Sequence, residues 1–154
     1  MRLTAARVAA EHERLADRAA DVVSLTNEVR EELGAVFGTD VAPVTAAAYR
    51  EELDAVFARG DRAVNVAALA ALLRELDVEG DYPGFVVDEL LGRELAATVA
   101  GPQPLRLLAE ATFHYADIRA NGETAGADDL DAALAAGIQT RLPGWEWRDG
   151  DSPF

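Results

Sequence analysis

The feature that most restricts the fold of this chain is an apolar, alanine-rich run at positions 63–76, AVNVAALAALLREL. Its larger apolar side chains recur every three or four residues: Val66, Leu69, Leu72, Leu73 and Leu76. That spacing places them on one face of a helix, and the alanines between them let other backbones approach closely. We expect this run to be the central helix of an all-α domain, with Asn65 as its N-cap.

Composition favours a single domain whose hydrophobic core is made mainly of small side chains. Half of the 154 residues are hydrophobic, which is enough to bury a core in one domain of this length. Only 6% of the residues are aromatic, and much of the apolar content is alanine. The core should therefore consist of closely packed helices with small contacts.

The charge balance is strongly acidic. The chain has 28 acidic residues against 14 basic ones, the basic residues are all arginine, and the net charge is −14. Like charges at this density repel one another in ordinary salt and are screened at high salt. In composition the chain resembles proteins of extreme halophiles, with a high-GC actinobacterium as the alternative source.

Several functional classes lack the residues they need. The absence of cysteine excludes disulfides, a thiolate nucleophile and cysteine-ligated metals. The first residues do not read as a signal peptide, and the longest charge-free runs, 63–73 and 95–105, are too short to cross a bilayer. We expect a cytoplasmic protein without a cofactor and without membrane contact.

Positions 3–33 read as one long amphipathic helix. Val8, Leu15, Val22 and Val29 recur every seven residues along it. Such a stripe is compatible with a two-stranded coiled coil, which would make these four residues a partner-binding seam and the protein a homodimer. The alternative is that the stripe is buried inside the bundle of its own chain.

Further helices are expected over 43–58, after the turn 80–83 as far as Ala100, over 104–120 and over 128–142. The fold predicted is thus an all-α, single-domain bundle of five to six helices over residues 1–142, with a long amphipathic N-terminal helix. Residues 143–154 form an aromatic C-terminal tail that contains Trp145, Trp147 and Phe154. Those aromatic side chains either pack on the bundle or bind another subunit or a partner.

One polar set has the spacing of a metal site. Glu110, His114 and Asp117 lie four and three residues apart, so a helix places them on neighbouring turns of one face. Carboxylates and imidazole can bind a divalent metal or transfer a proton. The competing interpretation is a solvated polar face that is opposite the apolar side of the helix.

Two other stretches resemble known motifs only in part, one a calcium-binding loop and the other a DNA-binding helix pair. Positions 117–128 resemble a calcium-binding EF-hand loop in part, but Arg119 would place a cation among the ligands. A helix-turn-helix reading of 66–95 gives its second helix Asp88, Glu89 and Glu94 against the single Arg93. Because DNA recognition needs cations, this argues against nucleic acid as a partner.

The function expected from the sequence is therefore that of a non-enzymatic acidic protein, of a regulatory or adaptor type, that acts through protein–protein contacts. The first alternative is a metal-binding protein or enzyme that uses Glu110, His114 and Asp117. The second is an acidic nucleic-acid mimic or antitoxin, which would need one dense acidic stripe on its surface.

The charge analysis predicts that the fold needs high salt. At roughly 2 M KCl the screening length falls below ~3 Å, which removes most repulsion between surface carboxylates. We expect full helicity by circular dichroism in molar KCl and a lower melting temperature at low salt. Full helicity with an unchanged melting temperature in low salt would contradict the halophilic interpretation.

Overall fold

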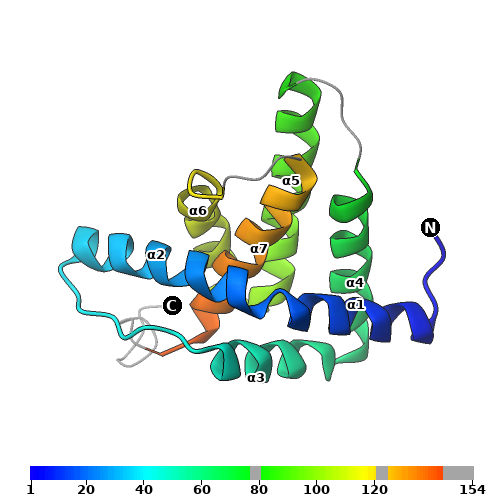
Figure 1. Cartoon of the computed structure of the whole chain (residues 1–154), viewed down its shortest axis with the longest axis horizontal. Coiled ribbons are helices and arrows are strands. Elements are labelled where there is room, and N and C mark those ends of the chain that lie inside the picture. Colours follow the sequence, from blue (N-terminus) through cyan, green and yellow to red (C-terminus); the bar gives the residue numbers. More distant parts are fainter. Residues whose placement is uncertain (77–80, 121–124, 144–154) are drawn as a thin grey trace.

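The computed structural model describes residues 1–76, 81–120 and 125–143, with side chains for 1–76, 89–120 and 129–143. Within these residues all regular secondary structure is helical, and it belongs to one domain (Figure 1). The described helices are α1 Ala5–Asp17, α2 Ala19–Phe37, α3 Ala46–Phe57, α4 Gly60–Glu75, α5 Asp81–Ala100, α6 Leu105–Asp117 and α7 Ala125–Arg141. The all-α, single-domain prediction is confirmed, but the described part alone has seven helices instead of five to six.

The additional helix arises because the predicted long N-terminal helix is two helices. Arg18 interrupts it with φ −81° and ψ 3°, and helical hydrogen bonding restarts where Val22 N–H donates to the Arg18 carbonyl at 3.0 Å. Figure 1 shows α1 and α2 running end to end with a bend between them. No Gly or Pro marks this break in the sequence. At the break, Arg18 instead makes a two-bonded ion pair with Asp131 of α7.

The end of α2 also lies later than predicted. The helix continues to Phe37 and ends at Gly38, which adopts the left-handed φ of +65° that glycine tolerates best. Thr39 N–H then donates to the Gly34 carbonyl at 2.8 Å. Gly34, which directly follows the predicted helix end at position 33, is buried inside the helix, where the Thr39 carbonyl oxygen passes too close for a side chain.

The start of α4 differs from the expected one. The helix begins at Gly60 with Arg59 as N-cap, so the prediction that Asn65 is the N-cap was wrong. Asn65 lies in the second turn and is exposed. The acceptor in the first turn is Asp61, whose carboxylate receives a hydrogen bond from Arg62 N–H at 2.9 Å.

The central helix of the bundle is α7 instead of α4. Helix α7 packs against α2, α3, α4, α5 and α6, and nearly all its side chains from Asp129 to Leu142 are buried. Figure 1 shows it between α5 and α6. Its alanines and Gly137 present little bulk on any face, which lets neighbours approach from all sides. None of the described helices is long and apolar enough to cross a membrane.

Two glycines allow the closest helix contacts. A Cβ at Gly137 of α7 would lie 2.8 Å from the Ala96 carbonyl oxygen and 2.8 Å from Val99 Cβ, both on α5. A Cβ at Gly92 of α5 would lie 2.6 Å from the Phe113 ring of α6. The backbone of α5 is therefore in direct contact with both neighbours, and any side chain at either glycine would separate them.

This packing predicts that Gly137→Ala lowers the free energy of unfolding by about 1–3 kcal/mol, because the added methyl group overpacks the interface of α5 and α7. Gly60→Ala is the matched control, since a Cβ at Gly60 meets nothing within 4 Å. We expect it to change stability by less than about 0.5 kcal/mol in chemical denaturation. A Gly137→Ala protein as stable as the parent would contradict this account of the core.

Candidate interaction site

An apolar groove of about 600 Å³ lies between the first half of α1, the end of α3 and the start of α4. Its lining residues are Leu3, Thr4, Ala5, Val8, Ala9, His12, Phe57, Gly60, Ala63 and Val64. Two of the larger apolar side chains, Leu3 and Val64, are 40% and 41% exposed. The groove therefore offers apolar surface to a molecule outside the bundle.

Local sequence explains why the groove is open. Thr4 is the N-cap of α1, and its hydroxyl oxygen accepts a hydrogen bond from Arg7 N–H at 3.1 Å, which fixes where the chain enters the helix. The floor and walls are then built largely from residues with little or no side chain: Ala5, Ala9, Gly60 and Ala63. Small residues at these positions leave space that larger ones would fill.

One wall of the groove is an ordered aromatic pair. The His12 ring stacks on Phe57, with ring centroids 4.4 Å apart and planes 3° from parallel. His12 Nε2 also lies 2.8 Å from a carboxylate oxygen of Asp54, which holds the ring in this orientation. The stack connects α1 to α3 and gives the groove a flat face suited to another aromatic side chain.

A buried carboxylate outside the groove lining attaches α1 to α4. Glu11 is fully buried, and Nη1 of Arg74 donates to both its oxygens at 2.6 and 2.8 Å. Arg14 donates to it at 3.0 Å, and Nε of Arg7 lies 3.2 Å away. Three partly exposed arginines thus neutralise one buried carboxylate. The contact with Arg74 holds α1, the helix that carries Val8, against α4.

One of these arginines, Arg7, extends the cluster to the end of α4. Arg7 donates a hydrogen bond of 2.6 Å to the carboxylate of Glu75. This hydrogen bond holds the pKa of Glu75 below its ordinary value, because it stabilises the charged carboxylate. Arg7 of α1 therefore binds the last residue of α4, Glu75, as well as Glu11 of its own helix.

The heptad stripe falls mostly inside the molecule. Leu15, Val22 and Val29 are each fully buried in the core of their own chain, so the description of these three as a partner-binding seam is corrected. They face inward because α2 packs on α3, α6 and α7, and α1 on α3 and α4. Val8 is half-buried and lines the groove. Trp145, Trp147 and Phe154 lie outside the described residues.

The metal candidates lie on α6. His114 is exposed, Asp117 is half-buried, and Glu110 has Arg106 as an ion-pair neighbour at 4.0 Å. Wherever the structure describes side chains, no group of three His, Asp or Glu residues is placed to hold a metal ion. Metal binding by these residues stays a prediction without a described site.

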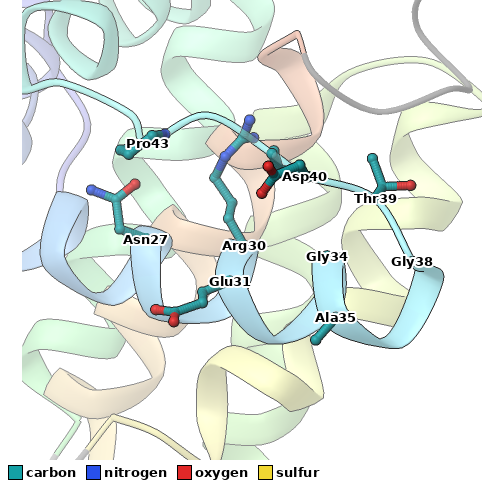
Figure 2. A pocket seen from close by; sticks show the side chains of 10 residues that line it. Asn27, Arg30, Glu31, Gly34, Ala35, Gly38, Thr39, Asp40 and Pro43 are labelled. Carbon is teal, nitrogen blue, oxygen red and sulfur yellow. The ribbon is translucent and has the colours of Figure 1, made fainter.

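A second cavity, of about 650 Å³, lies between α2 and the loop that follows it (Figure 2). Its polar side chains hold that loop. Nε of Arg30 donates to the Ala42 carbonyl at 3.2 Å and Nη2 to the Pro143 carbonyl at 2.8 Å, while Asn27 exchanges two hydrogen bonds with the Val44 backbone. Burial lowers the pKa of Arg30. These side chains already have a structural role, so we do not assign a ligand to this cavity.

The groove, the Glu11 cluster and the Arg30 contacts were all missed by sequence reasoning. Each depends on which helices become neighbours, and the heptad pattern carries no such information. One usable signal existed for Glu11: it lies three residues after Val8 and four before Leu15, on the inward side of a helix. A carboxylate in that position needs cationic partners.

The Glu11 cluster predicts that Glu11→Gln lowers the free energy of unfolding by about 2 kcal/mol, because three guanidinium groups lose their shared counter-ion. The matched control is Glu13→Gln, which removes an exposed charge on the same helix. We expect the control to stay within about 0.5 kcal/mol of the parent in urea unfolding. Equal losses in the two variants would contradict the role given to Glu11.

Searches of curated proteins and of solved structures gave no significant match. One family model matches the chain, over residues 1–154. The chain therefore belongs to the family described as "Domain of unknown function (DUF7984)".

Proposed function

We propose that this protein is non-enzymatic and acts through protein–protein contacts, with the apolar groove as its docking site. The observation that supports this most directly is the groove itself, a cavity of about 600 Å³ with mostly apolar walls and an aromatic stack on one side. Apolar concave surface of this kind is typical of sites that receive side chains of another molecule.

The occupant we propose is the aromatic tail of a second copy of this chain. Residues 144–154 include two tryptophans and a phenylalanine, the residue types that contribute most to interface energy. The tail also has three acidic residues and one arginine. Arg2 directly precedes Leu3 of the groove lining, so at least one cation lies next to the groove for an acidic tail.

Chain length favours a second copy over the protein's own tail. The carbonyl of Pro143 is hydrogen-bonded to Arg30, which is 22 positions from Val8 along α1 and α2. These helices run end to end with a bend between them (Figure 1), so the two positions are at most about 33 Å apart at 1.5 Å per residue. Trp147 is only four residues beyond Pro143, and four extended residues reach ~14 Å. Backbone reach therefore favours the groove of a second copy as the site that receives the tryptophans.

Tryptophan fluorescence tests this proposal directly. The chain's only two tryptophans are at 145 and 147, so their emission reports on the tail alone. We expect the emission maximum to shift to shorter wavelength as protein concentration rises, and light scattering to show a parallel increase in mass. Val64→Arg should weaken association about 10-fold or more, because it places a charge in the groove.

Val36→Arg is the matched control, since Val36 is 61% exposed on α2 and lies outside the groove. It should associate as the parent does. A short-wavelength emission that is independent of concentration in a monomer would mean that the tail binds its own chain, which contradicts the proposal. Emission typical of solvated tryptophan at every concentration would contradict it as well.

The setting we propose is the cytoplasm of a halophile. This rests on the acid excess and the absence of lysine, which suit a medium of high ionic strength. The acidic-mimic alternative requires one dense acidic stripe. Acidic residues instead occur on all the described helices, and those that pair with arginine include Glu11, Glu52, Glu94 and Asp131.

A further inference from the structure

A basic pocket of about 290 Å³ lies between the start of α4, the end of α5 and the start of α6. Its lining residues are Arg59, Asp61, Arg62, Asn65, Ala97, Thr98, Gly101, Pro102 and Arg106. Three arginines and one aspartate therefore face a common space in a chain whose net charge is −14. A cluster of positive charge on so acidic a chain suggests a specific role for the pocket.

Arg62 is the residue that makes this pocket unusual. It is half-buried, and its guanidinium has no ion pair or hydrogen bond with any side chain or backbone group that the structure describes. One of its terminal nitrogens lies 3.0 Å from the place where a Cβ on Gly101 would stand. Gly101 has φ +106°, so a glycine is required there on conformational grounds, and its bare Cα leaves room for the guanidinium.

The surroundings of Arg62 disfavour its positive charge. Burial lowers the pKa of Arg62, and the nearby cations Arg141 and Arg59 lower it further, while Asp61 offsets part of this effect. Arg141 is itself fixed in place, since it pairs with Glu52 at 2.9 Å and donates to the Ala100 carbonyl at 3.1 Å. A negatively charged ligand would relieve this repulsion.

The remaining groups of the pocket divide into engaged and available ones. Arg106 is engaged, because it pairs with Glu94 at 2.8 Å. The Thr98 hydroxyl donates to the Glu94 carbonyl at 2.7 Å. Arg59 and Asn65 are exposed, and their side chains form no ion pair or hydrogen bond with the described residues. Arg59, Arg62 and Asn65 are therefore the donors that a ligand can use.

We propose that this pocket binds a phosphate group carried by a small molecule, with Arg62 and Arg59 as charged donors and Asn65 as a neutral one. The planar guanidinium fork matches phosphate oxygens in pairs, which a single ammonium group does not. The site is separate from the proposed docking groove. Both use the first two turns of α4, but the groove uses Ala63 and Val64 and the pocket uses Arg62 and Asn65.

The test is thermal unfolding of the full chain with inorganic phosphate as the probe, at an ionic strength held constant with KCl. At phosphate ten times its Kd, we expect the melting temperature of the parent to rise by about 4 °C. Arg62→Gln and Arg59→Gln should each reduce this rise, with the affinity for phosphate about 10-fold lower for Arg62→Gln. The emission of the tail tryptophans should stay unchanged in Arg62→Gln, because Arg62 does not line the docking groove.

Arg50→Gln is the matched control, because Arg50 is exposed on α3, lies outside the pocket and makes no ion pair with the described residues. It gives the same net charge as the other two variants and should keep the full response to phosphate. General stabilisation by phosphate as a solvent additive would instead raise all four proteins equally. That result, or a parent that does not respond, would overturn the proposal.

A second measurement separates a ligand site from a structural arginine. In the absence of phosphate, Arg62→Gln should melt at the same temperature as the parent or higher, because it removes a half-buried charge next to other cations. If Arg62→Gln melts lower, the exposed Arg59→Gln decides the question. An unchanged phosphate response in Arg59→Gln would then overturn the proposal.

Discussion

The close approach of α5 and α7 at Gly137 is the contact on which the rest of the structure depends. Because a Cβ at this position would lie 2.8 Å from the Ala96 carbonyl oxygen, the two backbones meet with no side chain between them. Gly92 repeats the arrangement toward the Phe113 ring of α6. A core built from alanine gains little per residue from apolar area, so it relies on many close contacts at high packing density.

The alanine-rich packing also determines where in the molecule an accessible site can form. Helix α7 takes neighbours on all sides, and α1 packs against α2, α3 and α4 at the edge of the bundle. At that edge α1 is attached by a polar cluster around Glu11 and by the His12–Phe57 stack. Directed contacts of this kind hold a helix without filling the space beside it. In the centre of the bundle, alanines let helices pack tightly. At the edge, where α1 has fewer neighbours, the same small residues leave open volume, and this volume is the groove.

The sequence predicts features that depend on neighbouring residues better than features that depend on residues far apart in the chain. Helices α3 to α7 were located within a few residues, because helix-end signals act locally: Thr45 is the N-cap of α3 and Pro104 the N-cap of α6. The break at Arg18 was not, since the carboxylate to which Arg18 makes two hydrogen bonds, Asp131, is 113 positions away. The same applies to Glu11, whose principal partner Arg74 lies on another helix. Of the candidate site, only Val8 was named in advance.

The arginines show how a strongly acidic chain uses its few positive charges. Most of those whose surroundings are described are bound to carboxylates: Arg7, Arg14, Arg18, Arg74, Arg93, Arg106, Arg119 and Arg141. Arg30 is bound to backbone carbonyls. Where carboxylates outnumber cations two to one, a half-buried guanidinium such as Arg62 would be expected to find one. Arg62 instead lies near Arg59 and Arg141 with Asp61 offsetting only part of their effect, and the proposed phosphate would supply the missing negative charge.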